Sequence, residues 1–78
     1  MEPERVRINT DRIKVQQLLK WVGAAQTGGQ AKEMIARGEV SVNGEREYQR
    51  GRQLLPGDLV QLADGRSFIL VGRGEEWS

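Results

Sequence analysis

Hydrophobic residues in the first half of the chain recur at the spacing of an amphipathic helix. Thr10 and Asp11, residue types that commonly cap helices, precede the first such stretch. Its apolar positions are three or four residues apart and share one helical face: Val15, Leu18, Leu19 and Val22. Gly23 follows as a typical stop signal, so the pattern predicts a first helix that ends before this glycine.

A second helix has a clearer start. Thr27 and Gln30 have the spacing of a capping box, in which the Thr hydroxyl accepts from the N–H of Gln30 and the Gln30 side chain reaches back to Thr27. The buried face is expected to consist of Ala31, Met34 and Ile35. Gly38 suits the position just after the C-cap, so a helix is predicted between Thr27 and Gly38.

The other segments alternate polar and apolar residues, as strands do. Residues 5–8 suit a short edge strand, and Val40 and Val42 precede Asn43-Gly44, a strong two-residue hairpin signal. Further strands are expected within residues 50–55, 59–62 and 67–71, with turns at 56–58 and 64–65. This order predicts an α+β fold, with two packed helices against a small antiparallel β-sheet.

The residue content excludes several function classes. The 78 residues include no Cys and no His, so disulfides, thiolate nucleophiles and the commonest general base and metal ligand are missing, and we expect neither a metal nor a cofactor. The longest apolar run, residues 68–71, is too short to cross a bilayer, and the Met-Glu-Pro-Glu start does not match a secretory signal. We therefore expect a small cytoplasmic binding module that has no membrane partner.

Positive charge is concentrated in the predicted helices, although the formal net charge is only +1. Between positions 12 and 37 there are five basic residues and one acidic residue, a distribution typical of a polyanion-binding face. At Gly28 and Gly29 the missing Cβ would let a phosphate reach free N–H groups at the helix start, with Lys32 one turn further on. A tight loop between the helices explains these glycines equally well.

Four short motifs together carry a resemblance to a known family. They are Lys-Val-Gln-Gln-Leu-Leu at 14–19, Thr-Gly-Gly-Gln-Ala-Lys at 27–32, Gly-Glu-Val-Ser-Val-Asn-Gly at 38–44 and Gly-Asp-Leu-Val at 57–60. The sequence resembles the S4 RNA-binding domain over residues 13–71, and within that family the stand-alone bacterial YaaA/YbcJ type. Residues 1–12 then form an N-terminal segment with the edge strand, and residues 72–78 a mobile tail.

The resemblance implies an S4-like fold (αL motif) whose helices present a basic surface to structured RNA, commonly ribosomal or transfer RNA. It assigns basic contacts to Lys14 and Lys32. Gly28 stands where many family members have Arg, a replacement that the YaaA/YbcJ type shares, and Gln16 stands where many have an acidic residue. Arg50 and Arg52 would project to the same side of an extended stretch and enlarge the surface.

We therefore predict a monomer without catalytic activity that binds structured RNA, most plausibly ribosomal RNA, in ribosome assembly or translation. A basic helical face suits this task because double-stranded RNA is recognised by shape, phosphates and 2′-hydroxyls. The predicted RNA contacts are Lys14, Gln17, Lys20, Gly28, Gly29, Lys32, Arg37, Arg50 and Arg52.

Two alternatives remain at this point. An enzyme is disfavoured because the carboxylates are scattered and no phosphate-binding loop motif is present. A protein-interaction module that associates with the ribosome through the β half and the C-terminal tail, with Trp77, stays open. Trp21 is expected to be half-buried at the edge of the core, with base stacking as the alternative, and Tyr48 could hydrogen-bond or stack.

Overall fold

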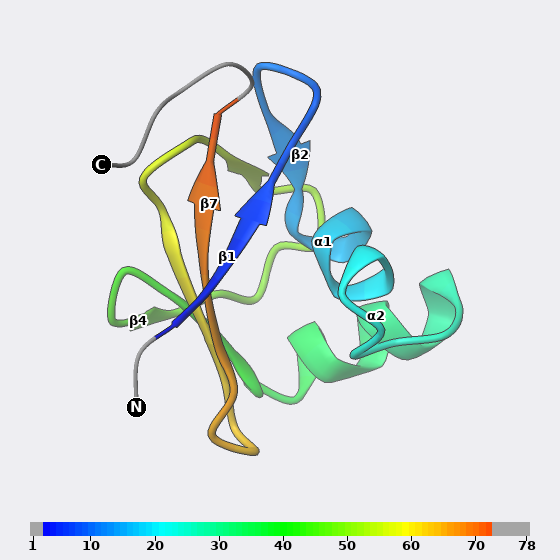
Figure 1. Cartoon of the computed structure of the whole chain (residues 1–78). Helices are drawn as coiled ribbons and strands as arrows, with labels where there is room; N and C mark the ends of the chain where they lie inside the picture. The colour runs from blue at the N-terminus through cyan, green and yellow to red at the C-terminus, as the bar shows by residue number, and fades with distance from the viewer. Residues whose placement is uncertain (1–2, 73–78) are drawn as a thin grey trace.

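Two helices lie on one side of a β-sheet in the computed structural model of the chain, which describes residues 3–72 (Figure 1). The elements are, in order, β1 Glu4–Arg7, β2 Ile13–Lys14, α1 Val15–Trp21, α2 Gly28–Ala36, β3 Val40–Val42, β4 Glu45–Arg46, β5 Gln53–Leu54, β6 Leu59–Leu62 and β7 Ser67–Val71. The α+β class and its two helices agree with the sequence-based prediction. Residues 73–78, which make up most of the predicted tail and include Trp77, lie outside the described residues.

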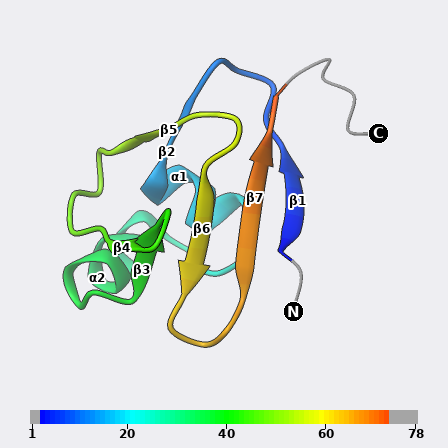
Figure 2. The same cartoon turned by 90° about the vertical axis from the view of Figure 1, so that its left-hand side faces the viewer.

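The main sheet has five strands in the order β1-β7-β6-β3-β4 (Figure 2). The pairs β7–β6, β6–β3 and β3–β4 are antiparallel, as expected. The edge strand β1 is predicted correctly, but it runs parallel to β7, with Val6 opposite Leu70. No hairpin joins these strands and fixes their relative direction, because both helices and five strands separate them in the sequence.

The start of α1 differs from the prediction. The N-cap is Lys14 rather than Thr10 or Asp11, and its backbone N–H donates to the side-chain oxygen of Gln17 at 3.1 Å. The chain stays extended up to this point because β2 pairs antiparallel with β5, which places the buried Ile13 opposite Leu54. This pairing joins segments about 40 residues apart, so local helix signals could not reveal it.

The second helix begins and ends as predicted. The Thr27 hydroxyl accepts from the N–H of Gln30 at 3.1 Å, which satisfies one of the free donors of the first turn. The Gln30 side chain reaches back one residue further than a capping box requires and accepts from the N–H of Gln26 at 2.7 Å. Gly38, with φ of +74°, follows the C-cap Arg37.

Hydrogen bonds join the motif at residues 38–44 to the motif at residues 57–60. Asn43 and Gly44 form the predicted hairpin turn, both with positive φ, at 53° and 89°. The Asn43 amide donates to Asp58 Oδ1 at 3.0 Å and its oxygen accepts from the N–H of Leu59 at 3.0 Å. Asp58 Oδ2 accepts from the N–H of Leu55 at 2.8 Å, which also closes the Pro56-Gly57 turn. We call this set the Asn43–Asp58 clamp.

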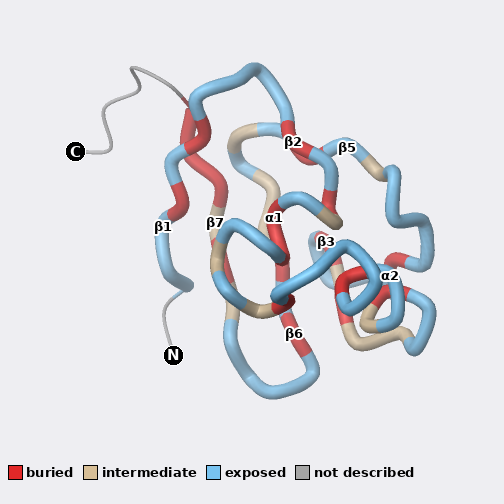
Figure 3. Tube along the Cα trace, turned by 90° about the vertical axis from the view of Figure 1, so that its right-hand side faces the viewer, coloured by how far each residue is buried: buried red, intermediate tan, exposed pale blue. Residues whose placement is uncertain are grey.

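The core lies between the helices and the sheet (Figure 3). Val15, Leu18 and Leu19 of α1 are fully buried, as are Ala31 and Ile35 of α2, whereas Val22 and Met34 are only partly buried. The helical spacings thus identified the buried faces correctly. Within residues 3–72, no helix is long and apolar enough to cross a membrane.

Candidate nucleic-acid interface

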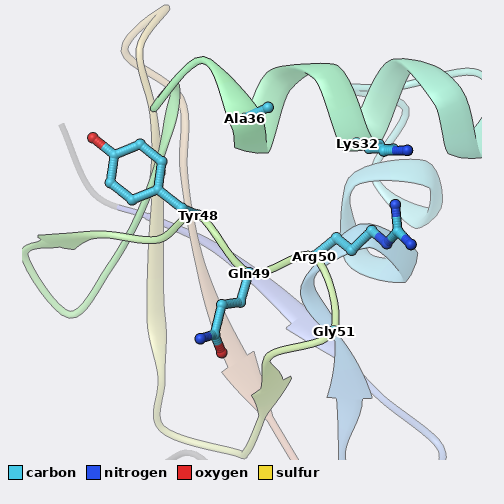
Figure 4. Close-up of a pocket in the computed structure, with 6 residues that line it drawn as sticks. All are labelled: Lys32, Ala36, Tyr48, Gln49, Arg50 and Gly51. Carbon is cyan, nitrogen blue, oxygen red and sulfur yellow. The ribbon is translucent and has the colours of Figure 1, made fainter.

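An open groove of about 560 Å³ separates the outer face of α2 from the loop that follows β4. Figure 4 shows its lining, which is Lys32, Ala36, Tyr48, Gln49, Arg50 and Gly51. Two of these six residues are cations and none is a carboxylate. The local charge is therefore positive. On the α2 side of the groove, Ala36 contributes only a methyl group.

The loop that forms one wall of the groove is held by the backbone of α1. The N–H of Val15 donates to the carbonyl of Arg52 at 2.9 Å, and the N–H of Gln16 to that of Arg50 at 3.4 Å. The N–H of Arg52 donates to the carbonyl of Gln49 at 3.1 Å and closes a turn. Residues 49–52 thus include a turn, so the extended stretch on which a shared direction of Arg50 and Arg52 depends is not found.

A buried carboxylate fixes the same loop from inside. Glu47 is 9% exposed; its Oε1 accepts from Arg52 Nη1 at 2.7 Å and its Oε2 from the N–H of Gln49 at 3.0 Å. Burial works to raise the pKa of Glu47, but the hydrogen bonds from Arg52 and Gln49 outweigh it, so the pKa lies below its ordinary value. The same ion pair raises the pKa of Arg52. Arg52 is therefore engaged in holding the loop.

Arg50 and Lys32 differ from Arg52, since neither forms an ion pair with another residue of the described segment 3–72. Within residues 3–72 the ion pairs are Arg37–Glu33, Arg52–Glu47 and Arg66–Asp64. The Arg50 side chain extends from the loop toward Lys32 on α2 (Figure 4). Two cations from different segments thus line one groove, and no carboxylate of the described residues competes with an anion for their donors.

The first turn of α2 adds exposed backbone donors on the same side of the helix. Gly28, Lys32 and Ala36 are four residues apart and lie on one exposed stripe. A Cβ at Gly28 would meet no atom within 4 Å, and one at Gly29 only the Thr27 hydroxyl at 3.8 Å. Packing within the described chain therefore does not require glycine at either position, which favours close approach by a ligand over the tight-loop explanation.

Comparison with known proteins identifies the family of the chain. The family model of the S4 domain matches residues 6–71. The chain belongs to the S4 domain family. It is also 39% identical over 66 residues to a *Bacillus subtilis* (strain 168) protein named "Probable ribosome maturation protein RlbA", an alignment that covers 85% of this chain and 93% of the relative. This match and this relative confirm the S4 resemblance that the four motifs carry, and S4 domains are RNA-binding modules.

The S4 fold distributes the nine predicted contact residues over several environments. Lys32, Arg50, Gly28 and Gly29 lie at the groove or at the adjoining start of α2. Lys14 and Lys20 are exposed at the two ends of α1, whereas the side-chain oxygen of Gln17 is used as a helix cap. Arg37 pairs with Glu33 at 2.8 Å on the surface of α2.

Sequence reasoning gave too little weight to two residues of this S4 surface. The burial of Glu47 was not foreseen, although the acid lies five residues before the basic Arg52, with which it pairs. The sequence leaves hydrogen bonding and stacking open for Tyr48, and the structure places it in the lining of the groove with 59% of the residue exposed. Trp21 is 58% exposed and so covers less of the core than expected. Among residues 3–72, no group of three or more His, Cys, Asp or Glu could hold a metal ion.

Proposed function

We propose that this protein binds structured ribosomal RNA, as a monomer without catalytic activity, and acts in ribosome maturation in the bacterial cytoplasm. The observation that carries the proposal is the convergence of Lys32 and Arg50 on one groove that has no carboxylate in its lining. The name of the *B. subtilis* relative supports the ribosomal setting. Transfer RNA is the competing RNA class.

The chemistry of the groove suits the phosphate backbone of a folded RNA. A guanidinium and an ammonium, supplied by different elements, can each neutralise a phosphate. The exposed N–H groups at the start of α2 provide further donors one turn away from Lys32. Lys14, the last residue of β2, and Lys20 of α1 are further exposed cations that RNA could contact. None of these contacts requires base-specific hydrogen bonds, so recognition would rest on RNA shape.

The proposal is tested by RNA binding at several salt concentrations. The variant Lys32→Gln/Arg50→Gln should weaken binding and lower the slope of log affinity against log salt by about two, one for each lost phosphate contact. The matched control is Arg5→Gln/Arg7→Gln, which removes the same charge from β1, at the opposite edge of the sheet from β4 (Figure 2).

Four results are informative. Loss of binding in the groove variant alone supports the proposed surface, and equal loss in both variants contradicts it by indicating non-specific attraction. Comparing ribosomal RNA fragments with transfer RNA identifies the RNA class. Failure to bind any RNA at low salt refutes the proposed function altogether.

A protein-interaction role keeps one supporting observation. The exposed Trp21 lies beside the edge strand β1 in a shallow hollow that also includes Arg5 and Arg7. Binding of a ribosomal protein that persists at moderate salt and survives Lys32→Gln/Arg50→Gln would favour this second candidate, because apolar contacts are not screened by ions.

A further inference from the structure

Tyr48 holds a defined position at the end of the groove and still leaves most of its side chain in solvent. A Cβ at Gly38 would lie 3.2 Å from Tyr48 Oη and 3.3 Å from Cε1, so only a glycine lets the ring lie this close to the backbone. The residue nevertheless remains 59% exposed. One part of the ring is thus packed against the protein, and the rest is available to a ligand.

An exposed aromatic residue alone needs no explanation, because single apolar residues are common on protein surfaces. Tyr48 differs because it shares its groove with Lys32 and Arg50, as Figure 4 shows. The complementary ligand is planar and carries negative charge close to the plane. A nucleotide has both properties, since its base offers a π-face and its phosphates the charge.

We propose that the groove binds one unpaired nucleotide of the RNA, with its base stacked on Tyr48 and its neighbouring phosphates on Lys32 and Arg50. This inference rests on the proposed RNA-binding function and narrows its substrate class. The preferred RNA is a helix interrupted by a bulge or loop, because a base within a continuous duplex must first lose its pairing and stacking to enter the groove.

The shape of the groove agrees with such an occupant. Its volume of about 560 Å³ falls within the range of roughly 300–1,000 Å³ that is usual for small-ligand sites. Figure 4 shows the Tyr48 ring at one end of the lining and Lys32 and Arg50 at the other, with Ala36 of α2 between them, so the nucleotide would lie along the groove. From Lys32 the exposed stripe of α2 continues to Gly28, so the flanking backbone can follow the helix toward its N-terminus.

The test compares two RNA hairpins that differ only in a single bulged adenosine in the stem. Wild-type protein should bind the bulged hairpin about tenfold more tightly than the fully paired one, the size expected for one base stacked on an aromatic ring. Tyr48→Leu should lose this preference and bind the paired hairpin as wild type does. Tyr48→Phe should retain the preference, because the ring face is unchanged.

Trp21→Leu is the matched control, since Trp21 is an equally exposed aromatic residue outside the groove and its loss should leave the preference intact. As a direct readout, 2-aminopurine at the bulge should lose fluorescence on binding wild type or Tyr48→Phe, but not Tyr48→Leu. A hairpin whose bulged position lacks a base should bind like the paired hairpin.

The outcomes separate this inference from the proposed function. If wild type binds both hairpins equally, or Tyr48→Leu keeps the preference, the stacking site is refuted while RNA binding stands. If neither hairpin nor any ribosomal RNA fragment binds, the proposed function fails, and the nucleotide site fails with it.

Discussion

The Asn43–Asp58 clamp and the groove beside α2 use similar polar residues in opposite ways. In the clamp, the Asn43 amide, the Asp58 carboxylate and two backbone N–H groups satisfy one another. In the groove, Lys32 and Arg50 have no ion-pair partner among the described residues. Both regions carry motifs of the S4 family. Residues that satisfy each other maintain the fold, and those left free are available to bind RNA.

The same contrast separates two arginines only two positions apart. Arg52 Nη1 lies 2.7 Å from a carboxylate oxygen of the buried Glu47, whereas Arg50 lines the open groove. A turn lies between them, closed by the bond from the N–H of Arg52 to the carbonyl of Gln49. Proximity in sequence therefore did not imply a shared role.

The largest expected effect is loss of stability when the clamp is broken. Asn43→Ala removes two hydrogen bonds, one of them to a carboxylate, and places alanine at a φ of 53°. We expect the free energy of unfolding to fall by about 2–3 kcal/mol, measured by urea denaturation. RNA affinity of the folded protein should not change, because the clamp lies outside the groove.

Asn43→Gly is the control that separates the hydrogen bonds from the backbone conformation. Glycine tolerates the positive φ, so this variant should lose less stability than Asn43→Ala, by about 1 kcal/mol. Equal losses would mean that the backbone conformation contributes nothing. A loss of RNA affinity in either folded variant would contradict the division between the two regions.

The second prediction is that alanine substitutions of the two arginines affect different properties, one stability and the other RNA binding. Arg52→Ala should lower the free energy of unfolding by about 1–2 kcal/mol, since it leaves Glu47 buried and unpaired, although part of the guanidinium is exposed and its contribution is reduced by solvent. Arg50→Ala should leave stability nearly unchanged and weaken RNA binding roughly fivefold to tenfold. Thermal unfolding and RNA titration of both variants measure the two effects.

Two outcomes would contradict the different roles of Arg50 and Arg52. If Arg50→Ala destabilises the protein as much as Arg52→Ala does, Arg50 has a structural partner that the described contacts omit. If Arg52→Ala abolishes RNA binding while the protein remains folded, the half-exposed guanidinium is itself an RNA contact. Either outcome would remove the distinction between the two positions.

Local signals in the sequence predicted much of the fold. The stripes of α1 and α2, the Thr27 cap, Gly38 and the Asn43-Gly44 hairpin depend on residues a few positions apart, and all are found in the structure. The cap of α1 was predicted wrongly because it depends on pairing between β2 and β5. The parallel direction of β1 likewise depends on β7, near the other end of the described chain.

In the candidate site, too, the features that depend on neighbouring residues were predictable and those that depend on distant contacts were not. The exposed Lys32 and the glycines at the start of α2 were evident from composition and spacing. The different roles of Arg50 and Arg52 were not, because they depend on the turn at 49–52 and on the burial of Glu47, which the neighbouring sequence does not specify. Tyr48 acquires its place from contact with Gly38, ten residues earlier in the chain.

A smaller effect is expected from acid. Because the folded protein holds the pKa of Glu47 below its ordinary value, ionised Glu47 stabilises the fold above the unfolded-state pKa of about 4.3. This stabilisation is lost as pH falls through the lower folded-state pKa. Glu47→Gln should therefore show a shallower loss of stability between about pH 5 and pH 3, measured by denaturation at each pH.

Asp64 provides an internal comparison for the acid experiment. The backbone N–H of Arg66, together with its guanidinium, lowers the pKa of Asp64, so this carboxylate acts in the same direction in the same pH range. Glu47→Gln should then remove only part of the pH dependence, and Asp64→Asn another part. An unchanged slope in Glu47→Gln would show that the loop carboxylate does not stabilise the fold.

The smallest change in stability, and the sharpest distinction between the two regions, is expected at the start of α2. Gly28→Ala and Gly29→Ala add a methyl group where the described chain leaves space, and alanine favours the helix. We expect the free energy of unfolding to stay constant or rise by up to about 1 kcal/mol. RNA affinity should fall several-fold, because the methyl groups would obstruct a phosphate at the free N–H groups.

Unchanged affinity would mean that RNA does not approach this turn, and lowered stability would restore the tight-loop explanation of the glycines. Increased stability with weaker RNA binding is the result expected if glycine at positions 28 and 29 serves RNA binding rather than folding.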